Sequence, residues 1–300
     1  MTPLLLAVSQ GHTKVARMLL CDLKVNSKVK SREMSLMHYA VQSGNPDCVQ
    51  LLLDYSIDFD DVTANSHLTG ALVIEQGVTP LILACQIGLH DAVRMLVIAG
   101  ARLDVAVDDY KTPLFYAICK NHVQCVEILL ENGGANPNYI VRLPVDEPWS
   151  WFCYPLFVAI NKNALKCLKV LLRAGSDLGT IAINDNLEPV SCLEFALSLH
   201  HYTAVEMLLA AGFPSMVVNR DEFETGYMAL ASENEELRGR LSARLQSPLS
   251  LMEIARLCLR EQCMGSRGRG EGKLLKDLLH GLPLPSYLLR YLQFGELEDY

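Results

Sequence analysis

The sequence lacks the features that mark membrane, secreted and nucleic-acid-binding proteins. No apolar run reaches eighteen residues, and the first residues show no charged-then-apolar signal pattern. The formal net charge is −8, which argues against nucleic acid as the main partner because phosphate binding needs a basic face. We therefore expect a soluble intracellular protein of the cytoplasm, with the nucleus left open as a second compartment.

Signatures of catalytic and metal sites are also missing. The chain has no Cys-x2-Cys pair and no Gly-x-Ser-x-Gly, His-Glu-x2-His or Gly-x-Gly-x2-Gly motif. Its 10 cysteines are better interpreted as reduced thiols than as a disulfide framework. His200 and His201 could bind a metal in isolation, but both fall at or beside positions of an internal repeat. We predict no enzyme activity, no metal and no cofactor.

Internal repetition is the main signal that is present. A short pattern recurs six times around an anchoring alanine, with spacings of 33, 44, 33, 42 and 37 residues, at Ala7, Ala40, Ala84, Ala117, Ala159 and Ala196. Twelve and thirteen residues after each alanine comes an apolar pair, from Leu19-Leu20 in the first repeat to Leu208-Leu209 in the last. Sixteen residues after the alanine, four repeats have glycine: Gly100, Gly133, Gly175 and Gly212.

Each offset has a physical reason in a pair of antiparallel helices. Alanine lets the two helices approach closely, and the apolar pair fills the space between adjacent repeats. Four residues past the alanine the chain must reverse, and a left-handed turn suits the glycines and asparagines found there better than His200. A Thr-Pro start gives a capping hydroxyl and a proline at the first helical position. Cysteines recur eight residues after the alanine and are predicted to be small buried residues: Cys48, Cys125 and Cys167.

These features resemble ankyrin repeats over residues 1–213, which implies an all-α solenoid that binds proteins on a concave surface. The predicted repeats span about 1–29, 34–66, 78–110, 111–140, 153–182 and 190–214. The first repeat begins at Met1 with no polar capping unit, so we expect it to expose an apolar face, as in a shortened form of a longer chain. Residues 214–246 are expected to form connecting or capping helices.

Two insertions interrupt the repeat period. The first lies between Tyr55 and Val78 and carries acidic residues. The second, residues 139–153, holds both tryptophans of the chain, Trp149 and Trp151. Inserted loops often project on the binding face, and tryptophan is enriched in binding hot spots. Two interpretations stay open: the tryptophans contact a target protein, or they fold back and cover the groove between repeats.

The C-terminal stretch, residues 247–300, has more apolar surface than it can bury alone. A short helix is expected after Pro248, with one apolar stripe made of Leu251, Ile254, Ala255, Cys258 and Leu259. Farther on, Leu282-Pro283-Leu284-Pro285 must be extended, because each proline fixes φ and removes a backbone donor. About fifty residues cannot bury all these leucines unaided, so a partner is predicted.

The order of these parts resembles the SOCS box of the ankyrin repeat and SOCS box family. The resemblance implies that the stripe from Leu251 to Leu259 contacts elongin B/C and that Leu282 to Pro285 select cullin-5 with its RING protein. Ala255 departs from the family, which usually has cysteine there, and we expect this to weaken the contact by about 1 kcal/mol. The function implied is a substrate-recognition adaptor of a ubiquitin ligase. The alternative is an ankyrin scaffold or inhibitor that recruits no ligase.

Overall fold

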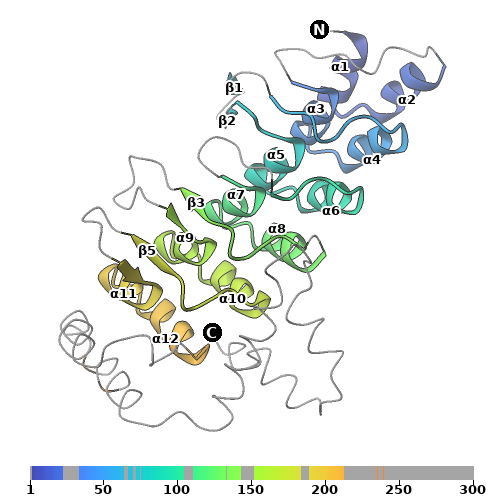
Figure 1. Cartoon of the computed structure of the whole chain (residues 1–300). Helices are drawn as coiled ribbons and strands as arrows, with labels where there is room; N and C mark the ends of the chain where they lie inside the picture. Colours follow the sequence, from blue (N-terminus) through green and yellow to red (C-terminus); the bar gives the residue numbers. More distant parts are fainter. Residues whose placement is uncertain are drawn as a thin grey trace, which may run out of the picture. The chain divides into compact units, whose positions relative to one another are not determined.

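The structure is a computed structural model. It describes residues 2–22, 34–63, 67–69, 72–74, 76–104, 111–132, 134–142, 152–183 and 189–212, together with Glu235 and Gly239. The chain forms two compact units, one ending at Ala135 and the other beginning at Asn136. Both units contain paired helices joined by tight turns (Figure 1).

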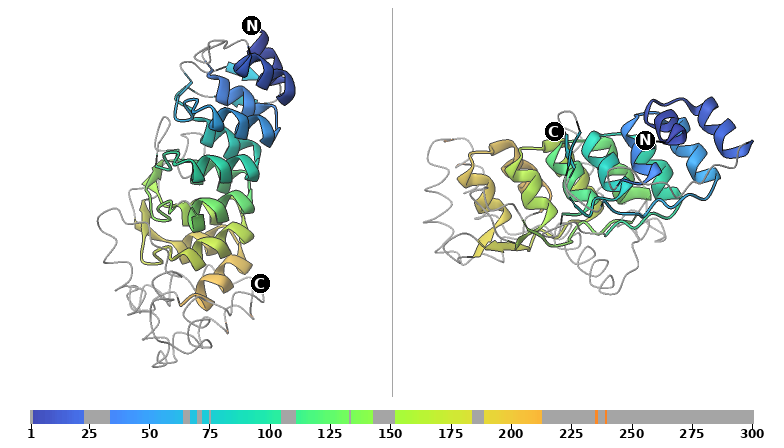
Figure 2. Two further views of the ribbon diagram at one scale, coloured as in Figure 1. Left: turned by 90° about the vertical axis from the view of Figure 1, so that its right-hand side faces the viewer. Right: turned by 90° about the horizontal axis from the view of Figure 1, so that it is seen from above.

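The first unit has two layers of helices. The odd-numbered helices contact one another in chain order, and so do the even-numbered ones, as two views of the ribbon show (Figure 2). The pairs are α1 (Pro3–Ser9) with α2 (Thr13–Cys21), α3 (Leu36–Gln42) with α4 (Pro46–Asp54), α5 (Pro80–Ile87) with α6 (His90–Ile98), and α7 (Pro113–Cys119) with α8 (Val123–Glu127), which continues as the π-helix η1 (Ile128–Asn132).

The second unit repeats this plan. Helix α9 contacts α11, and α10 contacts α12. The two pairs are α9 (Pro155–Asn161) with α10 (Leu165–Ala174), and α11 (Cys192–Ser198) with α12 (Tyr202–Ala210).

Short antiparallel hairpins were not predicted by the all-α interpretation. Strand β1 (His67–Thr69) pairs with β2 (Leu72–Ile74), β3 (Val141–Arg142) with β4 (Phe152–Cys153), and β5 (Ile181–Ile183) with β6 (Pro189–Ser191). The first two hairpins lie in the two sequence insertions. The fold of the described residues is therefore a helical solenoid with a small amount of sheet in its connections.

The Thr-Pro pairs cap the helices that follow them, as predicted. Thr2, Thr79 and Thr112 are N-caps with proline at the first helical position. The Thr79 hydroxyl accepts the backbone N–H of Ile82 at 3.2 Å, and Thr112 accepts that of Phe115 at 3.2 Å. Each hydroxyl thereby satisfies a donor that the first helical turn leaves without an intrahelical partner.

The third helix begins with a histidine-based cap instead. The backbone N–H of Ser35 donates to Nδ1 of His38 at 3.3 Å, so the proton of the neutral ring lies on Nε2. That Nε2 donates to the carbonyl of Val78 at 2.9 Å. The buried imidazole thus caps α3 and ties it to the segment that enters α5.

The turns between paired helices are left-handed, as the sequence predicted. All six positions that lie four residues after the anchoring alanine have positive φ: Gly11, Gly44, Gly88, Asn121, Asn163 and His200. His200, with φ of 57°, suits this conformation least, because glycine has no Cβ and asparagine visits it more readily than other residues.

The apolar pairs fill the core, with one difference between their members. The first residue of each pair is buried in every repeat, whereas the second is only half-buried at Leu53, Val97 and Leu209. The second residue therefore faces the margin of the helical layer in those repeats.

The fourth repeat contains one extra residue. The amide of Ala101 bonds to the carbonyl of Leu96 and that of Ser176 to Leu171, but the equivalent bond in the fourth repeat runs from Ala135 to Leu129. The π-helix η1 accommodates the additional residue. Gly134, with φ of 70°, has the left-handed conformation there. Gly133, the glycine that lies sixteen residues after Ala117, is outside the described residues.

Candidate functional site

The residues that the sequence singled out for partner binding all lie outside the described residues. This holds for the proposed elongin-contacting stripe Leu251, Ile254, Ala255, Cys258 and Leu259, for the cullin-selecting segment Leu282, Pro283, Leu284 and Pro285, and for Trp149 and Trp151. The site that the structure does describe is the surface of the repeats.

In α3, α7 and α9, which each lie on the inner side of their helix pair, only the last turn is accessible to a partner. In α3, residues 36–41 are buried and Gln42 is half-buried, while in α7 residues 113–118 are buried and Cys119 is half-buried. In the second unit, residues 155–160 are buried, and Asn161 and Lys162 are the accessible ones. The accessible row is mostly polar, so hydrogen bonds would contribute much of the contact that a target makes with it.

Acidic residues of the first insertion serve the loop itself. A carboxylate oxygen of Asp60 accepts the backbone N–H of Arg102 at 3.1 Å, and its other oxygen lies 3.5 Å from the Arg102 Nε. Asp58 accepts the backbone N–H of Asp60, and Asp61 accepts that of Val62. These bonds fix the connection after α4 and the one after α6 relative to each other. Asp58, Asp60 and Asp61 therefore stabilise the loops through these bonds.

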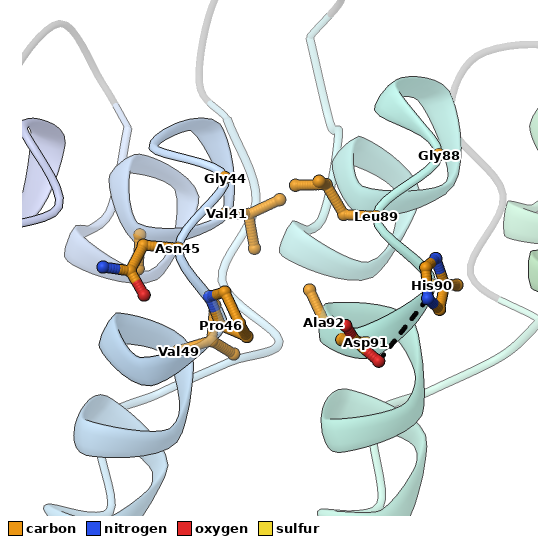
Figure 3. A pocket seen from close by; sticks show the side chains of 11 residues that line it. Val41, Gly44, Asn45, Pro46, Val49, Gly88, Leu89, His90, Asp91 and Ala92 are labelled. Atoms are coloured by element: carbon orange, nitrogen blue, oxygen red, sulfur yellow. Dashed lines mark ion pairs between the residues drawn. The ribbon is translucent and has the colours of Figure 1, made fainter.

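The edge formed by the short turns is the second accessible region of the first unit. A groove opens there between the turn of repeat 2 and that of repeat 3 (Figure 3). Its volume is about 160 Å³, and its apolar lining comes from Val41, Pro46, Val49, Leu89 and Ala92.

The rim of this groove is polar. His90 and Asp91 stand at the start of α6, where the His90 Nε2 lies 3.6 Å from a carboxylate oxygen of Asp91. On the facing side, Asn45 caps α4 and accepts the backbone N–H of Asp47. Figure 3 shows Leu89 reaching toward Val41 across one end, with Pro46 and Ala92 facing each other below. The groove therefore combines an apolar floor with polar groups at its margin.

The recurrent cysteines are core residues, as predicted, and not nucleophiles. Cys48, Cys125 and Cys167 are buried. Burial raises the pKa of the Cys125 thiol to about 11, and it also raises the pKa of Cys48 and that of Cys85. A thiol that stays protonated at neutral pH is a poor nucleophile and a poor metal ligand.

The adjacent histidines are engaged by different elements. The Nδ1 of His201 donates to the carbonyl of Ile160 at 2.9 Å, and the Nδ1 of His200 lies 3.1 Å from the hydroxyl of Tyr202. Over the described ranges, no three His, Cys, Asp or Glu side chains cluster closely enough to hold a metal ion. Within the same part of the chain, no helix has both the length and the apolarity needed to cross a membrane.

A sequence model described as ankyrin repeats, in three copies, matches residues 1–63 and 61–140. Together with the paired helices, capped starts and left-handed turns, this match shows that residues 1–140 contain ankyrin repeats.

Similarity to a solved structure supports the same fold. The chain resembles the human ASB11 ankyrin repeat domain with a TM-score of 0.57 and 23% identity, covering 83% of this chain and 100% of that one.

Similarity to curated proteins covers less than half of the chain. The mouse B-cell lymphoma 3 protein homolog is 30% identical over 142 residues, which are 46% of this chain and 29% of that protein. Human SH3 and multiple ankyrin repeat domains protein 1 is 37% identical over 100 residues, 33% of this chain and 4% of that protein. Mouse protein phosphatase 1 regulatory subunit 27 is 38% identical over 80 residues, 27% of this chain and 45% of that protein. The chain thus spans less than half the length of these relatives.

Proposed function

We propose that this chain is the non-catalytic substrate-recognition subunit of an elongin B/C–cullin-5–RING ubiquitin ligase. In this proposal the ankyrin repeats hold a target protein and the C-terminal stretch recruits the ligase. The observation that carries the proposal is the order of two sequence motifs, the apolar stripe from Leu251 to Leu259 followed by Leu282-Pro283-Leu284-Pro285. This order resembles the SOCS box, and it follows an array that binds proteins.

The mechanism requires no chemistry from this chain. Holding a target beside a ubiquitin-charged partner makes the transfer effectively intramolecular, which raises the local concentration of the target's lysines. The outcome expected in cells is ubiquitination and proteasomal degradation of the bound protein. An adaptor needs only two binding surfaces on one chain, which agrees with the buried, protonated thiols of the repeats.

The two tail motifs give separable tests. Changing Leu251 and Leu259 together to aspartate should abolish co-purification of elongin B/C and, with it, of cullin-5, because charges would face the apolar contact. Changing Leu282 and Pro285 to alanine should reduce cullin-5 capture while elongin B/C stays bound. Arg256→Ser, on the same expected helix but off the apolar stripe, is the matched control and should capture both.

A scaffold or inhibitor without ligase recruitment is the second candidate. The observation that favours it is that the sequence model matching residues 1–140 is one of ankyrin repeats alone, and that a protein phosphatase regulatory subunit is among the curated relatives. The same experiment separates the two candidates. A chain that binds neither elongin B/C nor cullin-5 in its unaltered form has the array function alone.

A further inference from the structure

The groove between repeats 2 and 3 exists because one bridging side chain is replaced. In repeats 2 and 4, the residue five positions after the anchoring alanine lies on the turn of the preceding repeat. Asn45 does so in repeat 2, where its Nδ2 donates to the carbonyl of Gly11 at 2.9 Å. His122 does so in repeat 4, where its ring is so close to Gly88 that a Cβ there would meet it at 2.6 Å.

Repeat 3 has Leu89 at this position, and the space above the preceding turn stays open. A Cβ built on Gly44 would meet nothing within 4 Å. Leucine cannot donate a hydrogen bond to the turn as Asn45 does, and its side chain reaches toward Val41 instead (Figure 3). Within the first unit, this substitution of an apolar for a bridging polar residue is the structural origin of the groove.

The size and lining of the groove favour an aliphatic side chain as its ligand. Its volume of about 160 Å³ is several times the roughly 30 Å³ that one water molecule occupies, so it holds a side chain. Val41, Val49 and Ala92 offer no hydrogen-bonding side chain to ordered water. An aliphatic group that displaces water from such a surface gains free energy in proportion to the apolar area buried.

The charge at the rim predicts the charge of the residue next to the inserted side chain. The side chain of Asp91 lines the groove and is 60% exposed. The lining residues include no lysine or arginine. A cation next to the inserted side chain would therefore meet the Asp91 carboxylate, whereas an anion would be repelled by it.

We propose that this groove is an anchor site for an extended segment of a partner protein, which inserts one aliphatic side chain and places an adjacent basic residue against Asp91. The inference rests on the target-binding role proposed above and specifies the chemistry that this part of the array recognises. It does not depend on ligase recruitment.

The direct test is methyl NMR of the full chain with short peptides. Acetyl-Gly-Leu-Arg-Gly-amide should give saturable shifts at the methyl groups of Val41, Val49 and Leu89. Acetyl-Gly-Ala-Arg-Gly-amide lacks the aliphatic anchor and acetyl-Gly-Leu-Glu-Gly-amide reverses the charge. Each should bind at least about fivefold more weakly than the first peptide.

Two reciprocal substitutions test the origin of the groove. Leu89→His should place a ring over Gly44, as His122 lies over Gly88, and abolish the peptide shifts when measured at a pH where histidine is neutral. His122→Leu should open an equivalent groove between repeats 3 and 4, so that the first peptide produces new shifts at Val93. Circular dichroism of each variant checks that the helices are retained.

The proposal is overturned if the Leu-Arg peptide gives no saturable shift, if the Leu-Glu peptide binds as well, or if folded Leu89→His retains binding. Loss of elongin capture through changes at Leu251 and Leu259 should leave peptide binding unchanged, so failure of one proposal does not imply failure of the other.

Discussion

Repeats 1 and 2 have the same pattern of apolar residues but different surroundings. Leu6, Val15 and Met18 are 52%, 45% and 50% exposed, whereas the residues at the same repeat positions, Tyr39, Cys48 and Leu51, are 6%, 0% and 1% exposed. The expected exposure of the first repeat's apolar face is thereby confirmed. The comparison shows that a neighbouring repeat, and not the pattern itself, buries these positions, as expected for a fold in which each repeat contacts only its neighbours.

The largest expected difference concerns the outer helices. Leu51→Ala removes a fully buried side chain between α2 and α4 and should lower the free energy of unfolding by about 3 kcal/mol. Met18→Ala, at the same position of repeat 1, should lower it by less than about 1 kcal/mol because half of that side chain is already in water. Urea denaturation followed by circular dichroism measures both. Equal losses would contradict the role assigned to the neighbouring repeat.

The dependence of stability on alkaline pH gives a second contrast. Cys125 in repeat 4 occupies the repeat position that Val15, which does not ionise, occupies in repeat 1. Burial raises the folded-state pKa of Cys125 from 9.0 to about 11. The unfolded thiol ionises first, so the contribution of Cys125 to stability is complete below pH 9.0 and is lost as the pH rises toward 11. We expect a loss of about 2 kcal/mol from this group.

Cys125→Val, which introduces the residue of repeat 1, isolates that effect. The difference in unfolding free energy between the wild type and this variant should change by about 2 kcal/mol across the same pH range, because the titrations of groups that do not interact with Cys125 cancel and Cys85 is the one thiol coupled to it among those with a resolved shift. A difference that does not vary with pH would show that the Cys125 thiol is not held protonated by burial.

Loss of a helix N-cap should also destabilise the first repeat less than an inner repeat, but by a smaller amount than loss of a buried side chain. Thr112→Ala removes a buried cap whose hydroxyl accepts a bond of 3.2 Å and should destabilise the chain by about 1 kcal/mol. The equivalent bond at Thr2 is 3.4 Å long and half-exposed, so Thr2→Ala should have about half that effect. Thermal unfolding midpoints of the two variants would rank them. A larger effect at Thr2 would contradict the expected ranking.

The smallest effect concerns the strained turn of the last described repeat. His200 has φ of 57°, a conformation that glycine adopts without a Cβ clash at the corresponding turns of repeats 1 to 3. His200→Gly should raise the free energy of unfolding by about 0.5 kcal/mol, after allowing for the greater entropy of glycine in the unfolded chain. His200→Ala is the control, since it keeps the Cβ and should give no gain. If both variants lower stability equally, strain at this turn is not significant.

Much of the repeat architecture could be predicted because its causes are local. Left-handed turns, Thr-Pro caps and buried cysteines each depend on residue type at a fixed offset, and all were found where the offsets placed them. The hairpins were missed because their strands have only two or three residues, too few to show an alternating pattern. The extra residue in repeat 4 was missed because Gly133 lies at the expected offset of sixteen residues, whereas Gly134, one residue farther on, has the left-handed conformation.

The groove could not be predicted for a different reason. The groove exists because Leu89 does not cover the turn at Gly44 in the preceding repeat. This becomes apparent only when the surroundings of Gly11, Gly44 and Gly88 are compared in three dimensions. A signal was nevertheless present, because the bridging position has a polar residue in repeats 1, 2, 4 and 6 but an apolar one in repeats 3 and 5, and within the first unit only repeat 3 departs from the polar pattern. The function of the tail, in contrast, was inferred from motif order alone and stays a prediction.

The central claim is that one chain joins a protein-binding array to a ligase-recruiting tail, and complex formation from purified components tests it most directly. Purified full chain mixed with elongin B/C should elute as one complex on size-exclusion chromatography and then bind cullin-5. The variant with aspartate at both Leu251 and Leu259 should elute separately while its helical signal is unchanged. Separate elution of the unaltered, folded chain from elongin B/C would contradict the account and leave an ankyrin scaffold that recruits no ligase.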